Sequence, residues 1–236
     1  MTAVALLSGG LDSTVATAAA HREVGVALAL AVDYGQRAAA REVEASGRIA
    51  AALGVPHRTV SLDFLADVTG TALVDADAAL PRPDDAALDD AAGAAADSMA
   101  AVWVPNRNGL FVAVAATFAE GLGADRVVVG FNREEAATFP DNSEEFVDRT
   151  NAALSLSTRN GVRVVSPTAG LDKEGIVRMG YDLDAPLALV WSCYEGRDRP
   201  CGTCESCRRL ARALDRAGRR QRFEEEWNRA HQSPED

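Results

Sequence analysis

The sequence predicts an α/β protein, a doubly wound five-stranded parallel sheet followed by a small C-terminal cysteine-rich helical segment. Short apolar runs alternate with helical patterns, which favours parallel strands joined by right-handed crossovers. A serine and two glycines separate the first apolar run from the first helical stretch. All four cysteines fall between positions 193 and 207 of the 236 residues, and this length suffices for one domain with a substantial core.

The strands and helices are predicted in regular alternation. Strands are expected at residues 2–7, 26–32, 57–62, 125–129 and 162–165. Helices are expected at residues 12–20, 38–53, 109–122, 144–156 and 172–179, and as a helical tail at 205–227. In the second helix, Glu42, Glu44 and Arg48 fall on the predicted exposed face. Asp141 or Asn142 is expected to cap the helix at 144–156.

The most informative motif is Ser8-Gly9-Gly10-Leu11-Asp12-Ser13-Thr14. A strand, a glycine turn and a helix N-terminus form an anion site, because backbone N–H groups converge there and the helix dipole favours negative charge. The order Ser-Gly-Gly-x-Asp-Ser matches the pyrophosphate loop of enzymes that split ATP between its α and β phosphates. The alternative is an ordinary turn between a strand and a helix. As the nucleotide-binding stretch we take Leu7, Ser8, Gly9, Gly10, Leu11, Asp12, Ser13, Thr14, Val15, Ala16 and Thr17.

Domain organisation follows from this loop and the cysteines. Residues 1–185 are predicted to form the pyrophosphate-loop nucleotide-binding domain, and residues 186–236 the cysteine segment. Residues 66–101 change in composition to alanine, aspartate and a few prolines, and are interpreted as a flexible insertion or lid with some short helix.

Polar residues gather where predicted strands end. Asp33-Tyr34-Gly35-Gln36-Arg37 follows the second strand, and ligands of parallel sheets bind at such ends. Arg37 can bind a carboxylate through two hydrogen bonds. Lys173 is the only lysine and precedes a helix, which suits a β- or γ-phosphate contact. For Arg37, Arg107 and Lys173 a capping or surface role is the alternative.

The cysteine spacing Cys193-x7-Cys201-x2-Cys204-x2-Cys207 predicts a metal site. Thiolates this close in sequence can share one tetrahedral ion, and four thiolates with no open position are typical of a structural zinc ion, one per chain. An iron–sulfur cluster is the alternative. A redox pair is disfavoured because all four cysteines of the chain lie in this cluster.

Charge and hydropathy limit the partners. The chain has 24 basic against 35 acidic residues, a net charge of −11, which disfavours a polynucleotide ligand. No apolar stretch is long enough to predict a membrane span. The first strand begins without a basic, signal-like region, so a cytoplasmic location is expected.

These motifs occur in one order along nearly the whole chain, and that order resembles the 7-cyano-7-deazaguanine synthases. The motifs are Ser8-Gly9-Gly10-Leu11-Asp12-Ser13, Asp33-Tyr34-Gly35-Gln36-Arg37, Val104-Pro105-Asn106-Arg107-Asn108, Gly130-Phe131-Asn132, Phe139-Pro140-Asp141 and the segment from Ser192 to Cys207. Where many members of this family have Gly-Tyr-Pro-Asp-Cys-Arg, this chain has Thr138-Phe139-Pro140-Asp141-Asn142-Ser143. That stretch is similar to an archaeal-type subgroup.

The resemblance implies an adenine nucleotide alpha hydrolase-like fold and an ATP-dependent ligase of queuosine and archaeosine biosynthesis. The implied substrates are 7-carboxy-7-deazaguanine, ammonia and ATP with Mg²⁺, converted through an acyl-adenylate and an amide to the nitrile. The implied catalytic residues are Asp12, Ser13, Lys173 and Arg107. The implied substrate-binding residues are Tyr34, Gln36, Arg37, Asn132 and Asp141. A structural zinc ion, a homodimer and no direct contact with nucleic acid are implied as well.

Two alternatives remain open from the residues. One is another pyrophosphate-loop enzyme that adenylates its substrate, either an amide-forming synthetase or a tRNA-modifying enzyme. The tRNA version needs a basic face, which the net charge of −11 disfavours. The other is a non-catalytic nucleotide-binding module stabilised by zinc, which has no need of Asp12 or Ser13; both residues are present.

Overall fold

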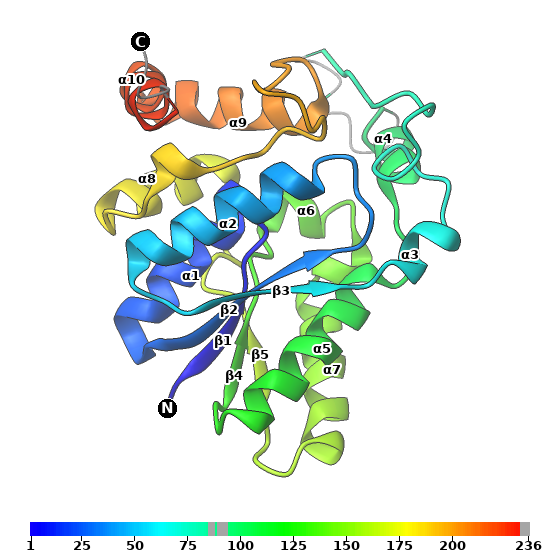
Figure 1. Cartoon of the computed structure of the whole chain (residues 1–236), viewed down its shortest axis with the longest axis vertical. Coiled ribbons are helices and arrows are strands. Elements are labelled where there is room, and N and C mark those ends of the chain that lie inside the picture. The colour runs from blue at the N-terminus through cyan, green and yellow to red at the C-terminus, as the bar shows by residue number, and fades with distance from the viewer. Residues whose placement is uncertain (85–87, 89–93, 232–236) are drawn as a thin grey trace.

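A parallel sheet of five strands forms the centre of the computed structural model, which describes residues 1–84, 88 and 94–231. The strand order is β3-β2-β1-β4-β5 (Figure 1). The strands are β1 (Ala3–Leu6), β2 (Val26–Asp33), β3 (His57–Ser61), β4 (Arg126–Val128) and β5 (Arg163–Val165). The five predicted strands are therefore confirmed, each end within one residue of its predicted position.

Helices cover both faces of the sheet (Figure 1). One face carries α1 (Leu11–Val24), α2 (Ala39–Leu53) and α8 (Lys173–Asp182), and the other carries α5 (Arg107–Gly121) and α7 (Glu144–Ser157). Side chains alternate along β1, as a strand requires. Ala3 and Ala5 join the core cluster on the α1 side, and Val4 joins the cluster on the α5 side.

The strand order reverses between β1 and β4. The chain adds β2 and β3 on one side of β1, and then returns to add β4 and β5 on the other. Loops leaving the carboxyl ends of β1 and β4 diverge there, which opens a crevice in parallel sheets. Ser8 follows β1 and Gly130 follows β4, so the predicted phosphate loop lies at this point.

The helical tail predicted at 205–227 is confirmed, and it is divided into two helices. It forms α9 (Glu205–Arg216) and α10 (Arg220–Ala230). Gly218, at φ +64°, lies between them, and a residue in the left-handed region ends a helix. Leu214 and Phe223 of these helices are buried in the same cluster as Leu11 of α1. The tail therefore packs on the core of the sheet domain.

The cap of α7, the start of α5 and the ends of α1 and α8 also differ from the prediction. Ser143 caps α7, because its hydroxyl accepts a hydrogen bond from the Phe146 backbone N–H. Asp141 and Asn142, the predicted caps, lie instead in the short 3-10 helix η2 (Pro140–Asn142). Helix α5 begins at Arg107, two residues before the predicted start.

The described part of the insertion is anchored to the body of the protein. It contains α3 (Phe64–Asp67) and α4 (Ala94–Val102), which confirms the prediction of short helix. The Arg37 guanidinium donates hydrogen bonds to the carbonyl oxygens of Ala72 and Ala78, at 3.3 and 3.1 Å. Part of the predicted lid, residues 85–87 and 89–93, lies outside the described residues. Across the described ranges, no helix combines the length and apolar character that crossing a membrane requires.

Candidate active site

A cavity of about 310 Å³ lies at the carboxyl ends of β1, β2 and β4, a size typical of small-molecule sites. Ser8, Tyr34 and Gly130, which follow these three strands, form its base. Lys173 of α8 and Arg209 of α9 complete its wall from the C-terminal side. The loop after β1 and the polar turn after β2 therefore line one cavity.

The hydroxyl groups of the phosphate loop form hydrogen bonds within the loop itself. The Ser8 and Ser13 Oγ atoms lie 3.0 Å apart, and Ser13 and Thr14 donate to the Gly10 carbonyl oxygen at 3.3 and 2.7 Å. Gly10 is the N-cap of α1 and supplies no side chain to bind the first N–H groups of the helix. These N–H groups point toward the cavity end of the helix, where an anion is favoured.

Two glycines permit close packing around this loop. Gly9 has φ +84°, and a Cβ there would lie 2.8 Å from the Glu42 carbonyl oxygen. A Cβ on Gly130 would lie 2.6 Å from the Ser13 backbone nitrogen. Both positions therefore exclude a side chain.

The predicted stretch divides between cavity wall and support. Leu7, Ser8, Gly10, Leu11, Asp12 and Ser13 line the cavity. Its other members lie behind this wall: Gly9, Thr14, Val15, Ala16 and Thr17.

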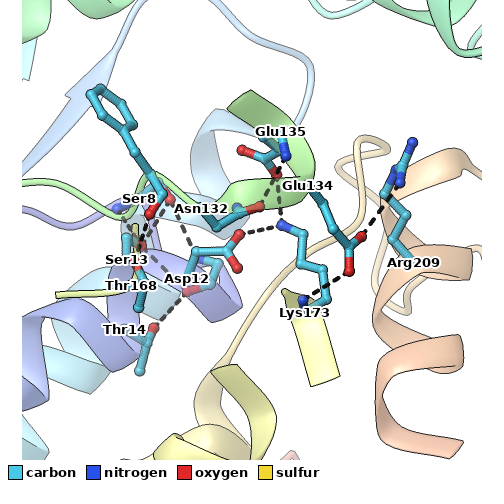
Figure 2. A network of polar contacts seen from close by, with 12 residues as sticks. Ser8, Asp12, Ser13, Thr14, Asn132, Glu134, Glu135, Thr168, Lys173 and Arg209 are labelled. Carbon is cyan, nitrogen blue, oxygen red and sulfur yellow. Dashed lines mark hydrogen bonds and ion pairs between the residues drawn. The ribbon is translucent and has the colours of Figure 1, made fainter. Parts of the chain in front are cut away.

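A buried charge cluster adjoins the loop (Figure 2). Lys173 Nζ lies 2.5 Å from Asp12 Oδ2 and 2.6 Å from Glu135 Oε1. The side chain of Lys173 is 11% exposed and that of Asp12 is 19% exposed. The alternative of a solvent-exposed surface lysine is therefore wrong. Lys173, Asp12 and Glu135 all line the cavity.

Burial and pairing compete within this cluster. Burial raises the pKa of Asp12 to about 6, although the charge of Lys173 opposes the shift. Burial acts against the charged form of Lys173, but Asp12 and Glu135 outweigh it and raise the lysine pKa. Burial also acts to raise the pKa of Glu135, and Lys173 reverses this and lowers it. Asp12 Oδ1 is buried without a hydrogen-bond partner among the described residues, so this oxygen can accept a further ligand.

The other end of the cavity is aromatic. Tyr34 and Phe111 line it with ring centroids 5.7 Å apart, and Phe139 also contributes. Arg107 lies over the Tyr34 ring at 5.9 Å and donates to the Tyr34 hydroxyl at 3.4 Å. Flat aromatic walls beside a guanidinium suit a planar ligand that carries a negative group.

Glu42 also lines this end, which corrects its predicted place on the exposed face of the helix. Gln36 holds the Glu42 carboxylate by a 2.9 Å hydrogen bond from Nε2. Gln36 is itself fixed, because its Oε1 accepts from the Tyr34 backbone N–H at 2.8 Å and its Nε2 also donates to Val32. Burial raises the pKa of Glu42, and the Gln36 hydrogen bond opposes the shift.

Three predicted substrate-binding residues lie outside the cavity wall. Arg37 binds the backbone of the insertion. Asn132 caps α6 (Arg133–Ala136) by accepting from the Glu135 N–H at 3.0 Å, and its buried Nδ2 has no partner among the described residues. Asp141 accepts from Asn142 at 3.2 Å. Their roles toward substrate remain predictions.

The four cysteines form one cluster. The sulfur atoms of Cys193, Cys201, Cys204 and Cys207 all lie within 4.8 Å of one another. Hydrogen bonds from the Cys204 and Cys207 thiols, and from backbone N–H groups, lower the pKa of the Cys193 thiol to about 2. Four sulfurs this close fit the tetrahedral thiolate site that the spacing predicts.

The cavity residues that the sequence did not predict include Glu42, Glu134, Glu135 and Arg209. Only Glu134 and Glu135 had a usable signal, since they follow the polar turn Gly130-Phe131-Asn132 at a strand end. Arg209 had none, because nothing in the spacing brings α9 to the sheet.

Comparison with known proteins identifies the family of this chain. The family described as "Queuosine biosynthesis protein QueC" matches residues 2–218. The 7-cyano-7-deazaguanine synthase of Desulforudis audaxviator is 51% identical over 218 residues, which is 92% of this chain and 98% of the relative. The 7-cyano-7-deazaguanine synthase of Methanosarcina barkeri is 46% identical over 220 residues, 92% of this chain and 95% of the relative.

Among solved structures, the NMN synthetase of Francisella tularensis is similar to this chain with a TM-score of 0.47 and 15% identity, over 100% of this chain and 89% of that one. The likeness of residues 138–143 to an archaeal-type subgroup remains a prediction. Because the match in sequence extends over nearly all of the chain, the protein belongs to the QueC family of 7-cyano-7-deazaguanine synthases.

Proposed function

We propose that this protein converts 7-carboxy-7-deazaguanine and ammonia to 7-cyano-7-deazaguanine at the expense of ATP. Membership of the family supports the reaction, and the observation that carries it is the phosphate loop beside the Asp12–Lys173 pair in one cavity. The family match favours this reaction over another pyrophosphate-loop amide-forming or tRNA-modifying enzyme.

At the polar end of the cavity, the loop and Lys173 would hold the polyphosphate of ATP. Ser8, Ser13 and the first N–H groups of α1 are the donors, and Lys173 is the cation that pairs with Asp12 of the loop. Donors fixed before the reaction stabilise the charge that builds on the departing pyrophosphate. Arg37, Thr14 and Thr17 would act indirectly, by shaping the insertion and the loop.

At the aromatic end, Tyr34, Phe111 and Phe139 would enclose the deazaguanine ring. Arg107 would bind the substrate carboxylate, and Glu42 would accept a hydrogen bond from an N–H group of the ring. Gln36 would position Glu42. Asn132 and Asp141, which lie outside the cavity wall, are further candidates for polar contacts with the substrate.

The reaction divides into two activations. A carboxylate oxygen attacks the α-phosphorus of ATP, and the bond to pyrophosphate breaks. Ammonia then attacks the acyl carbon, which releases AMP and a proton and leaves the amide. The amide oxygen then attacks the α-phosphorus of a second ATP, and the bond to pyrophosphate again breaks. Loss of AMP and of the two protons of the amide nitrogen leaves the nitrile. No protein nucleophile takes part.

Asp12 is the candidate ligand for Mg²⁺, because its buried Oδ1 lacks a partner among the described residues. Bound there, the ion would neutralise charge on the phosphates. In the cysteine cluster, the four thiolates would hold one Zn²⁺ as a structural ion. A homodimer, a cytoplasmic location and the absence of direct nucleic-acid binding complete the proposal, the last supported by the net charge of −11.

Product analysis tests this function. Purified protein is incubated with ATP, Mg²⁺, ammonium and 7-carboxy-7-deazaguanine, and the products are identified by mass. We expect the nitrile, with AMP and pyrophosphate formed only when the acid is present. ATP hydrolysis at the same rate with and without the acid, or formation of ADP, would contradict the proposal.

A further inference from the structure

Arg209 belongs to the cysteine segment and faces the charge cluster through Glu134. It belongs to α9, whose N-cap is Cys204 and whose first turn contains Cys207. Its guanidinium binds Glu205 Oε1 at 2.7–2.8 Å and approaches Glu134 Oε2 at 3.7 Å. The side chain is only 19% exposed, so this guanidinium is more than a solvent-exposed charge on a helix.

Glu134 carries the contact onward to Lys173. While Oε2 faces Arg209, Oε1 accepts a 2.9 Å hydrogen bond from the Lys173 backbone N–H (Figure 2). Lys173 is the first residue of α8 after its cap Asp172, and the first N–H groups of a helix have no partner within it. A carboxylate at this point also interacts favourably with the helix dipole. Glu134 therefore fixes the backbone from which the Lys173 side chain extends.

The next residue, Glu135, holds the other end of the same lysine. The Glu135 carboxylate accepts a hydrogen bond from Lys173 Nζ at 2.6 Å. Asp12 of the phosphate loop accepts a second hydrogen bond from the same nitrogen at 2.5 Å. Two neighbouring residues of the short helix α6 therefore bind the backbone and the ammonium group of Lys173 (Figure 2). A movement of α6 would displace the ammonium group relative to the phosphate loop.

We propose that Arg209 is a positioning residue, which holds Glu134 and α6 in place and thereby sets Lys173 for its contact with the polyphosphate. This inference rests on the proposed function for the role of Lys173. The folded cysteine segment then serves a second purpose: α9, which begins within that segment, is the element that brings Arg209 to the cavity. Direct contact of Arg209 with a bound ligand is the competing explanation, since Arg209 lines the cavity.

The first test measures structure and needs no turnover. Hydrogen exchange at the Lys173 amide is followed in the full-length, zinc-loaded wild type and in Arg209→Met. We expect exchange to become about tenfold faster in the variant, as for the loss of a hydrogen bond to a charged acceptor, while the zinc content stays at that of the wild type. The matched control is Arg229→Met, an exposed arginine of α10 in the same segment, which should leave this amide unchanged.

The second test separates positioning from ligand contact. In Arg209→Met we expect kcat to fall about 10- to 100-fold, as for other residues that orient an active group, with little change in KM for the acid. Glu134→Gln should cause a similar loss. The kcat of the double variant should lie no more than about twofold below that of the less active single variant. The two substitutions interrupt the same chain of contacts, so their effects should not add.

Three results would overturn the proposal. The first is a Lys173 amide that exchanges at the wild-type rate in zinc-loaded Arg209→Met, and the second is an unchanged kcat. The third is a full additional loss of kcat when Arg209→Met is introduced into the Glu134→Gln protein, which would indicate direct ligand contact.

If Arg209→Met does not fold, the Arg209→Lys variant provides the test, because lysine keeps the charge and loses the forked geometry of arginine. It should show intermediate exchange and kcat, and wild-type values of both would contradict the proposal. Inactive wild-type protein would refute the proposed function, while the exchange result would still decide the positioning role.

Discussion

At the scale of single residues, the site depends on a lysine buried between two carboxylates. Lys173, Asp12 and Glu135 come from three separate elements, and their charges compensate one another where water is largely excluded. Removing one partner from such a group leaves an uncompensated buried charge, which costs about 3–5 kcal/mol. The same arrangement presents a fixed cation beside the phosphate loop.

Replacing Lys173 tests its importance for the reaction. Lys173→Met removes the cation beside the departing pyrophosphate, so we expect kcat to fall by about 10²- to 10³-fold. Steady-state kinetics measure this loss, and denaturant unfolding measures the accompanying loss of stability. Arg178→Met is the matched control, because Arg178 lies on the same helix, is 54% exposed and pairs with Glu174. A variant of Lys173 with wild-type kcat would contradict the assignment.

The pKa of Asp12 predicts an acidic limb in the pH profile. Asp12 has a pKa of about 6 in the free protein, so it gains a proton below that pH and loses the charge that pairs with Lys173 and would bind Mg²⁺. We expect kcat/KM to fall as the pH drops through about 6. Glu135→Gln removes a negative charge that raises this pKa, so the limb should move to lower pH. A limb that stays in place, or moves upward, would contradict this account.

At the scale of elements, the packing of β4 against the start of α1 shapes the phosphate loop. A Cβ on Gly130 would lie 2.6 Å from the Ser13 backbone nitrogen and 2.8 Å from the Asp12 carbonyl carbon. These are backbone atoms of the loop, which cannot turn aside as a flexible side chain can. Only glycine permits the strand end to approach the loop so closely.

We therefore expect Gly130→Ala to displace the loop and to weaken ATP binding at least about tenfold, which isothermal titration calorimetry can measure. Gly121→Ala is the control, because that position has open space around the site of a Cβ and a helical glycine gains stability on substitution by alanine. Equal ATP affinity in both variants would contradict the close-packing argument.

The elements were predictable from the sequence to different degrees. Apolar runs bounded by turn residues located the strands, because burial on both faces of a parallel sheet requires such runs. The tail was predicted to be helical without its division into α9 and α10, which Gly218 separates with a φ of +64°. Glu42 was placed on an exposed face because local periodicity carries no information about the cavity that this residue lines in the folded protein.

The candidate site was predictable only in its local parts. The phosphate loop is one continuous motif, so its residues could be identified from their order. The contact of Lys173 with Asp12 joins positions 161 residues apart. The contact of Arg209 with Glu134 joins α9 to α6. Neither is encoded in spacing, because only the folded topology brings these elements together.

At the scale of the whole molecule, the sheet, the insertion and the cysteine segment enclose one cavity. The Glu205 backbone N–H donates to the Pro81 carbonyl oxygen at 3.1 Å, and Arg82 pairs with Glu195 at 2.5 Å. The insertion is thus fastened to the cysteine segment on one side and to Arg37 on the other. Ordering of the cysteine segment should therefore affect the whole site.

Removal of the metal tests this dependence. We expect one zinc ion per chain in freshly purified protein, and its removal by a chelator should lower the Tm, because structural zinc contributes folding energy. Metal analysis and thermal unfolding monitored by circular dichroism measure the two effects. Iron in place of zinc, or a Tm that does not change when the chelator is added, would contradict the assignment of a structural zinc ion.

The central claim is that the cavity activates a carboxylate, and then an amide, by attack of their oxygen atoms on the α-phosphorus of ATP. The most direct measurement starts from 7-carboxy-7-deazaguanine labelled with ¹⁸O in both carboxylate oxygens and follows the label by mass spectrometry. The account predicts that both AMP molecules formed per nitrile each carry one ¹⁸O atom, while pyrophosphate carries none. Label found in pyrophosphate or released to water, or AMP without label, would contradict it.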